Sequence, residues 1–222
     1  MTDLLRAVVI VDYQNLHLTG HGLFDRHAGK HEVLVHPGRY ARKLIQVRNS
    51  AQRDGHHQAV LSRVLVYRGL PSAEFDPDPY AWNQAQKSEW EKDPLVHVTH
   101  RPLKYRFQYT KDGQRATDSS NTPIVTGREE KGVDVLCALA LVRESLKEDV
   151  DLVILASQDS DLSHALDEAL AYGKAKVETS SWFKPREFRR SKEIHPTGGR
   201  RVWNTRMDES SFIAVRDTKF YD

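Results

Sequence analysis

The stretch Ala7-Val8-Val9-Ile10-Val11-Asp12 decides the fold that we expect of this chain. A continuous apolar run that ends in a charged residue is typical of a strand buried on both faces. A second such run, Leu152-Val153-Ile154-Leu155-Ala156, precedes Ser157-Gln158-Asp159-Ser160-Asp161. Strands buried on both faces belong to parallel sheets that helices cover on each side, so the two runs predict an α/β protein.

The rest of the chain alternates between the two kinds of element. Apolar patterns predict further strands over residues 59–67, 95–100 and 175–182, and helices that begin at residue 37 and cover 77–92, 131–147, 160–172 and about 208–216. Residues 17–36 contain five histidines among glycines, and we interpret them as a polar loop because their spacing fits no common zinc pattern. Strands that alternate with helices predict a Rossmann-like three-layer sandwich with a parallel sheet.

We expect one domain over residues 5–182, an insertion within it and a C-terminal extension. The insertion, residues 103–127, contains the turn signal Asp112-Gly113 and predicts a hairpin whose returning strand is 115–117. Its basic residues, Arg106 among them, alternate with aromatics, which suits either a solvated arm or a nucleic-acid contact. The extension, residues 183–222, is basic and is expected to pack on the domain; Arg189 and Arg190 in it are candidate substrate contacts.

Composition narrows the class of protein. The chain has 222 residues and a net charge of +2, so nucleic-acid binding would depend on local basic patches. A single cysteine, Cys137, excludes an internal disulfide and a cysteine zinc site. No apolar stretch is long enough to span a membrane, and the first residues lack a signal-peptide pattern. We therefore expect a cytoplasmic protein.

Four aspartates carry the candidate chemistry. Asp12, Asp159 and Asp161 follow the two apolar runs, and Asp134 falls in the first turn of the helix predicted over 131–147. Ligand sites in parallel α/β sheets lie at the carboxyl ends of the strands, so these carboxylates can converge there. Clustered carboxylates repel each other unless a cation or a proton neutralises them, and Mg²⁺ or Mn²⁺ is the simplest such cation. This pattern points to phosphate chemistry.

Three ordered motifs connect the chain to a known family. Val-Asp-Tyr-Gln-Asn at 11–15, Lys-Gly-Val-Asp at 131–134 and Ser-Gln-Asp-Ser-Asp at 157–161 resemble the motifs of NYN domains. These domains are a branch of the PIN-like nucleases that includes the LabA/DUF88-type proteins. The resemblance covers roughly residues 5–182.

The resemblance implies a PIN-like fold and cleavage of RNA with Mg²⁺ or Mn²⁺. By position, Asp12, Asp134 and Asp159 look like metal ligands, Asp161 looks like a further ligand or a supporting group, and Asn15 looks like a polar partner of the site. Many relatives carry another acid further along the helix that begins near 131, where this chain has Ala140 and Leu141. The number of metal ions therefore stays open.

Other side chains near the motifs have two interpretations. Lys131 can orient a phosphate or lie in solvent at a helix start, and Ser157 and Ser160 can bind phosphate or cap the following helix. All three are kept as candidate substrate contacts.

Competing functions remain. The first is a metal-dependent endoribonuclease with an RNA partner, and the second is a non-catalytic RNA-binding adaptor of the same fold; a homodimer is left open. A phosphatase of the haloacid-dehalogenase type needs a D-x-D after the first strand, where this chain has Asp12-x-x-Asn15. A dinucleotide-binding enzyme needs a G-x-G-x-x-G at the same place, and none is present.

Overall fold

The computed structural model describes residues 4–29, 32–51, 57–190 and 192–221, and leaves out the side chains of 188–190. Within these residues, the central sheet has six strands, each parallel to its neighbours. In spatial order they are β4 (Val96–Pro102), β3 (Ala59–Leu70), β1 (Leu5–Asp12), β7 (Leu152–Ala156), β8 (Lys176–Trp182) and β9 (Trp203–Met207).

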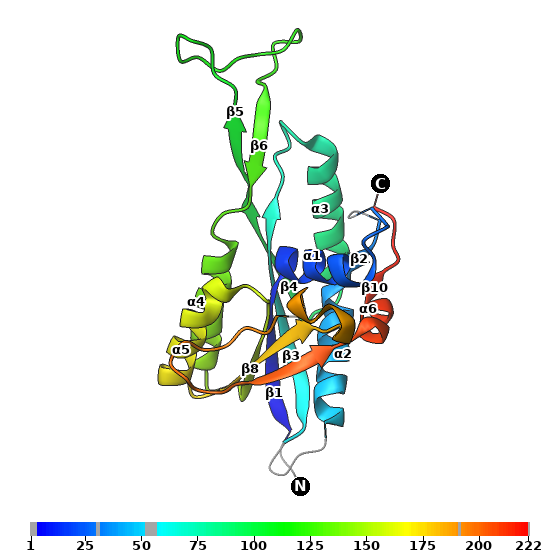
Figure 1. The fold of residues 1–222 in the computed structure, drawn as a ribbon, viewed down its shortest axis with the longest axis vertical. Coiled ribbons are helices and arrows are strands. Elements are labelled where there is room, and N and C mark those ends of the chain that lie inside the picture. Colours follow the sequence, from blue (N-terminus) through cyan, green and yellow to red (C-terminus); the bar gives the residue numbers. More distant parts are fainter. Residues whose placement is uncertain (1–3, 30–31, 52–56, 191, 222) are drawn as a thin grey trace.

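Helices cover both faces of the sheet (Figure 1). One layer contains α1 (Tyr13–Phe24), α2 (Pro37–Ser50), α3 (Pro77–Trp90) and the short α6 (Glu209–Ala214). The opposite layer contains α4 (Val133–Ser145) and α5 (Ser163–Tyr172), preceded by the 3₁₀ turn η1 (Ser160–Leu162). A second 3₁₀ segment, η2 (Pro185–Arg190), follows β8. The predicted Rossmann-like three-layer sandwich is therefore confirmed.

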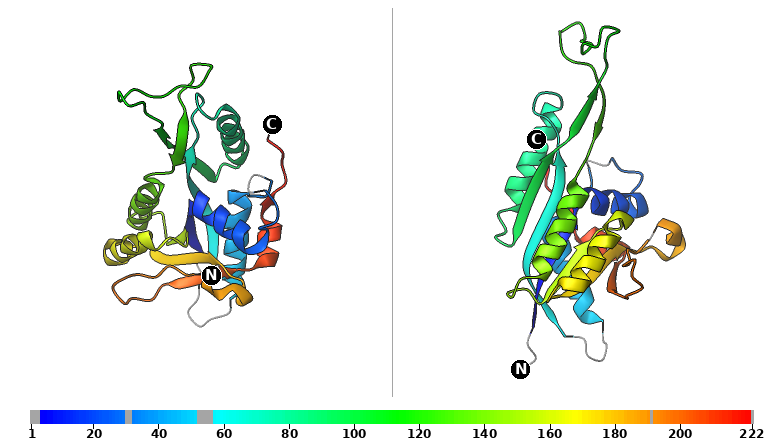
Figure 2. Two further views of the ribbon diagram at one scale, coloured as in Figure 1. Left: turned by 45° about the horizontal axis from the view of Figure 1, so that its top comes forward. Right: turned by 90° about the vertical axis from the view of Figure 1, so that its left-hand side faces the viewer.

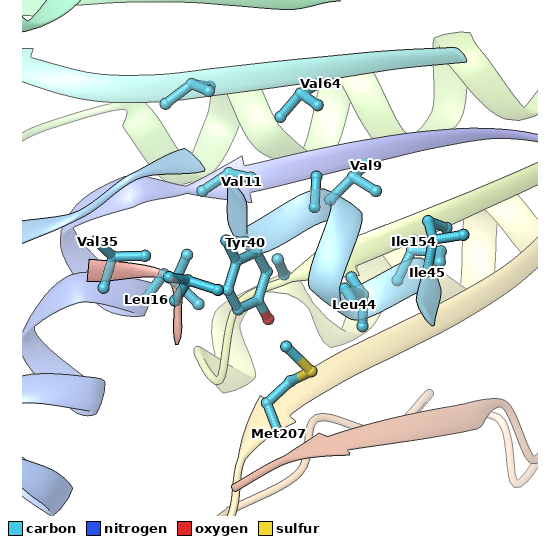
Figure 3. Packing of buried hydrophobic residues seen from close by; sticks show 14 of the residues in the cluster. Val9, Val11, Leu16, Val35, Tyr40, Leu44, Ile45, Val64, Ile154 and Met207 are labelled. Atoms are coloured by element: carbon cyan, nitrogen blue, oxygen red, sulfur yellow. The ribbon is translucent and has the colours of Figure 1, made fainter. Parts of the chain in front are cut away.

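The apolar run of β1 explains the two layers. All five residues from Ala7 to Val11 are fully buried. Ala7, Val9 and Val11 pack into the core under α1 and α2, whereas Val8 and Ile10 pack under α4 and α5. Successive side chains of a strand point to opposite faces, so a strand covered on both sides must be apolar throughout. Figure 3 shows the first of these cores, in which Val9 and Val11 lie near Tyr40.

The order of the strands locates the ligand-binding edge. Numbered in chain order within the sheet, the strands run 3-2-1-4-5-6, the doubly wound order. After β1 the chain continues to β3 on one side, and after β7 it continues to β8 on the other. The switch point therefore lies between the carboxyl ends of β1 and β7, where Asp12 and Asp159 are located.

The prediction of a polar loop over 17–36 was wrong for its first part. The helix α1 continues to Phe24, and Leu16, His17 and Leu23 are buried on its inner face. Gly20 allows this helix to approach the sheet, because a Cβ there would lie 2.8 Å from Trp182 Nε1. The segment looked like a loop because its histidines are polar, although some of them lie on the buried face of the helix.

The insertion forms a hairpin, but its returning strand was misplaced. β5 (Lys104–Phe107) pairs with β6 (Val125–Glu129) and not with residues 115–117, which make isolated bridges to Tyr109 and Pro123. The turn at Asp112-Gly113 closes only a short tip loop, because Gly113 N–H donates to Thr110 O. A second turn follows before the chain returns as β6.

The expected domain boundary at 182/183 must also be corrected. β9 pairs with β8 as a sixth strand, and Met207 and Phe212 are fully buried in the main core. The chain then returns to the body, where β10 (Arg216–Asp217) pairs with β2 (Leu34–Val35). The extension is thus part of the sheet and core of a single domain rather than an addition packed on its surface.

Candidate functional site

Asp12 is the most buried of the candidate acids. It ends β1 and caps α1, and only 5% of its surface is exposed. One carboxylate oxygen accepts the Asn15 N–H at 3.3 Å, and the other accepts the Ser157 hydroxyl at 3.0 Å. Burial, which these two hydrogen bonds only partly offset, raises the pKa of Asp12 to about 6, and the charges of Asp159 and Asp134 add to the rise.

The loop after β7 is fixed to its neighbours by a short network. Asn15 Oδ1 accepts the Gln158 N–H at 2.8 Å, and Gln158 Oε1 accepts the Trp182 N–H at 3.0 Å. Asp159 caps η1, because its Oδ1 accepts the Asp161 N–H at 3.0 Å. Asp159 and Asp161 both reach the same cavity as Asp12. Capping and facing the cavity are compatible, since a carboxylate has lone pairs for both.

The start of α4 brings the third acidic segment to this place. Gly132 has a φ of +77°, which turns the chain into the helix, and Arg101 Nε holds the carbonyl oxygen of Lys131 at 2.8 Å. Asp134 follows in the first turn, where the helix dipole favours a negative charge. The turn therefore directs Asp134 towards the strand ends.

Glu130 is a site carboxylate that the sequence analysis missed. It lines the cavity and accepts the Gly69 N–H, and the end of the Gln14 side-chain amide lies 2.9 and 3.0 Å from its two oxygens. Burial raises the pKa of Glu130 to about 7, and the nearby charges of Asp12 and Asp134 contribute. Its one sequence signal was its place directly before Lys131-Gly132-Val133-Asp134.

The absence of an acid at Ala140 and Leu141 left the number of metal ions open, and both residues are fully buried in the core beneath α4. Glu130 supplies an additional carboxylate from before the helix instead. Helical spacing could not predict that Glu130 reaches the cavity, because its position depends on the turn at Gly132 and not on the helix.

These segments line an open cavity of about 840 Å³ at the switch point. Six carboxylates line it, from Asp12, Glu129, Glu130, Asp134, Asp159 and Asp161. The two basic residues in the lining already have partners: Arg128 is paired with Asp76, and Lys131 with Glu129. Among the described residues, no salt bridge neutralises the other five carboxylates, so the cavity is strongly negative.

The donor chemistry of the cavity suits a hard divalent cation. Carboxylate and amide oxygens are what Mg²⁺ and Mn²⁺ prefer. In the described part of the chain, however, no group of three or more His, Cys, Asp or Glu side chains is arranged to hold an ion by itself. Mg²⁺ commonly binds through one or two carboxylates and keeps water or substrate phosphate as its other ligands. The residues therefore fit an ion that is shared with substrate rather than enclosed by protein.

The predicted site residues separate into three groups. The structure brings Asp12, Asn15, Lys131, Asp134, Asp159 and Asp161 to the cavity. Ser157 supports Asp12 from below, and Ser160 is exposed outside the lining. Arg106, on β5, is not in the lining but pairs with Glu129, which is, and the side chains of Arg189 and Arg190 fall outside the described residues.

A dinucleotide does not suit this edge of the sheet. In dinucleotide-binding folds of this strand order, a pyrophosphate occupies the N-terminus of the helix after the first strand. Here the Asp12 carboxylate itself accepts the Asn15 N–H at that end. A phosphate placed there without a cation would meet a negative charge, which agrees with the missing glycine pattern.

The comparisons with known proteins leave the function open. No model of a protein family matches the chain, and no curated protein matches it. Among solved structures, the chain is similar to a crystal structure of a protein of unknown function from Vibrio parahaemolyticus, with a TM-score of 0.41 and 15% identity over 87% of this chain and 93% of that one. In the described residues, no helix is both long and apolar enough to cross a membrane.

Proposed function

We propose that the protein is a metal-dependent endoribonuclease. The observation that carries this proposal is the convergence on one cavity, at the switch point, of five carboxylates that have no salt-bridge partner among the described residues. Such a concentration of negative charge is costly unless cations or protons offset it. The resemblance of three motifs to NYN domains supports RNA as the substrate.

The residues at the cavity have different roles in the proposed reaction. Asp12, Asp134 and Asp159 would supply ligands to Mg²⁺ or Mn²⁺, and water and substrate phosphate would complete its coordination. Asp161 would be a further ligand or a supporting group. Bound in this way, the ion would activate a water molecule and offset charge on the scissile phosphate. Asn15 fixes the loop after β7 through the Gln158 N–H, so it keeps Asp159 in position. Lys131, at the cavity rim, orients the phosphate once it exchanges Glu129 for the substrate.

The test uses labelled single-stranded RNA and purified protein in Mn²⁺. We expect cleavage by the wild-type chain, and a loss of at least about 100-fold in Asp12→Asn and Asp159→Asn, as for groups that stabilise transition-state charge. Asp149→Asn is the matched control, because Asp149 is exposed at the opposite edge of the sheet, before β7. Calorimetry should show weaker Mn²⁺ binding in Asp12→Asn but not in Asp149→Asn.

A non-catalytic RNA-binding adaptor is the second candidate. It is favoured by the lack, among the described residues, of three acids arranged around one ion. It predicts RNA binding that persists in EDTA, weakens with salt and is unchanged in Asp12→Ala. Equal residual cleavage by wild type and Asp159→Asn would indicate a contaminating nuclease and remove the support for the enzyme.

A further inference from the structure

The hairpin arm, residues 104–129, extends from the body of the protein (Figures 1 and 2). Its root is held firmly. Tyr105 and Arg128 both donate to the Asp76 carboxylate, and the ring of Phe75 packs against Tyr105 and Phe107 at centroid distances of 5.2 and 5.1 Å. The arm therefore leaves the body in a defined direction.

Beyond this root the arm is open to solvent. Nearly all residues from 108 to 126 are exposed, and 58% of the Tyr109 surface is exposed. A two-stranded hairpin without a third layer is only marginally stable in water. An extended arm that gains so little from packing on its own domain suits a binding role better than a structural one.

The side chains of the arm suit a single-stranded nucleic acid. Four exposed basic residues, Lys104, Arg106, Lys111 and Arg115, lie along it. The Arg115 guanidinium lies over the Phe107 ring, 4.0 Å from its centre, so this cation and this ring are held together on the arm. Exposed aromatic rings and guanidinium planes stack on unpaired bases, and nearby cations bind the backbone phosphates.

The arm is also continuous with the cavity. Residues 128–131, which end β6 and lead into α4, line the cavity. Glu129 accepts both Arg106 at 2.9 Å and Lys131 at 3.3 Å, so one row of charged groups runs from the cavity rim onto β5. A strand whose phosphate reaches the cavity would thus meet Lys131, Arg106 and then Tyr109 in order.

We propose that the arm binds the single-stranded segment next to the phosphate that enters the cavity. This inference rests on the proposed ribonuclease function for the choice of RNA as the ligand. From Lys104 to Tyr109 the backbone advances five residues, or about 17 Å at roughly 3.3 Å per residue. That length corresponds to about five stacked nucleotides at about 3.4 Å each. RNA shorter than this gains little from the arm.

The test measures the affinity of labelled RNA in EDTA by fluorescence anisotropy. A 20-nucleotide single strand should bind about 10-fold more weakly to Tyr109→Ala, the loss expected for one stacked base. The double variant Lys111→Ala/Arg115→Ala should also bind more weakly and depend less on salt. A four-nucleotide strand should bind all variants alike. Tyr172→Ala is the aromatic control, because Tyr172 is 68% exposed at the end of α5, away from the cavity edge, and Lys176→Ala is the basic control.

The outcomes distinguish the proposed RNA-binding role of the arm from the proposed ribonuclease activity. Equal affinities of Tyr109→Ala and Tyr172→Ala would overturn the role of the arm, even if Mn²⁺-dependent cleavage is found. Loss of affinity in the arm variants, together with no cleavage by wild type, would keep the arm and reject the nuclease. Competition by polyglutamate as strong as that by RNA would overturn the proposal in favour of an acidic protein partner. Equal binding of duplex RNA would overturn the stacking role of Tyr109.

Discussion

At the scale of single residues, the buried Asp12 and the half-buried Glu130 have no salt-bridge partner among the described residues. Their pKa values rise to about 6 and about 7, chiefly because burial disfavours the charged form. A shift of this size in Asp12 corresponds to a cost of about 3 kcal/mol when the group is ionised. The ionised carboxylates therefore destabilise the folded state, and a bound cation would offset this cost.

This cost predicts an unusual pH dependence. The folded state binds the Asp12 proton more tightly than the unfolded chain, so Asp12 lowers the free energy of unfolding as pH rises from about 4 through about 6. Asp12→Asn should remove this pH-dependent decrease in the free energy of unfolding, because asparagine does not ionise. In EDTA, the difference in melting temperature, variant minus wild type, should grow by roughly 5 °C between pH 4 and pH 8.

The difference between the two proteins is the quantity to measure by thermal unfolding. His36 and His100 have lowered pKa values because they are buried, so their contribution to stability increases with pH and opposes that of Asp12. They are present in both proteins and cancel in the difference. A difference that does not change with pH would contradict the raised pKa of Asp12.

At the scale of elements, the segment from β6 to α4 does most to build the site. It carries Glu130, Lys131 and Asp134 within five residues, and its direction depends on the positive φ of Gly132. A Cβ on Gly132 would lie 2.8 Å from Arg101 Nε, which holds the carbonyl oxygen of Lys131. Backbone angle and close contact both require glycine here.

Gly132→Ala should therefore affect stability and site together. We expect a loss of about 1–2 kcal/mol in unfolding free energy, because alanine strains at positive φ, and weaker Mn²⁺ binding as Asp134 shifts. Chemical denaturation and calorimetry measure the two effects. Gly22→Ala is the matched control, because Gly22 lies within α1 and a Cβ there would meet nothing within 4 Å. Unchanged Mn²⁺ binding in Gly132→Ala would show that the turn does not position Asp134.

At the scale of the whole molecule, the C-terminal segment completes the fold. β9 covers the edge of β8, and Trp90 Nε1 donates to Asp217 at 2.7 Å. Beneath β8, the buried Arg48 side chain donates to both oxygens of Glu178 at 2.7 and 2.8 Å, which fixes α2 to the sheet. Several basic residues of the C-terminal segment also make contacts within the protein. Arg200, for example, donates to Leu170 O.

A chain that ends at residue 190 should therefore fail to fold cooperatively. It would lack Met207, Phe212 and Val215 from the core and would expose the edge of β8. A chain that ends at residue 218 is the control and should keep a single sharp transition, because it retains all three. Circular dichroism during heating measures both. Cooperative unfolding of the shorter chain near the wild-type temperature would restore a domain boundary at 182/183.

The sequence by itself determined the sandwich, the strand ends and the positions of Asp12, Asp134, Asp159 and Asp161, because continuous apolar runs and the residues that follow them are local signals. The helix over residues 13–24 escaped it, since its buried histidines look polar in the sequence. The aromatic partners of its Phe24, Trp182 and Phe212, come from distant segments. Only the tertiary structure brought Glu130 into the cavity, paired β6 with β5 and placed β9 in the sheet. Each of these depends on contacts between distant segments, which no local periodicity records.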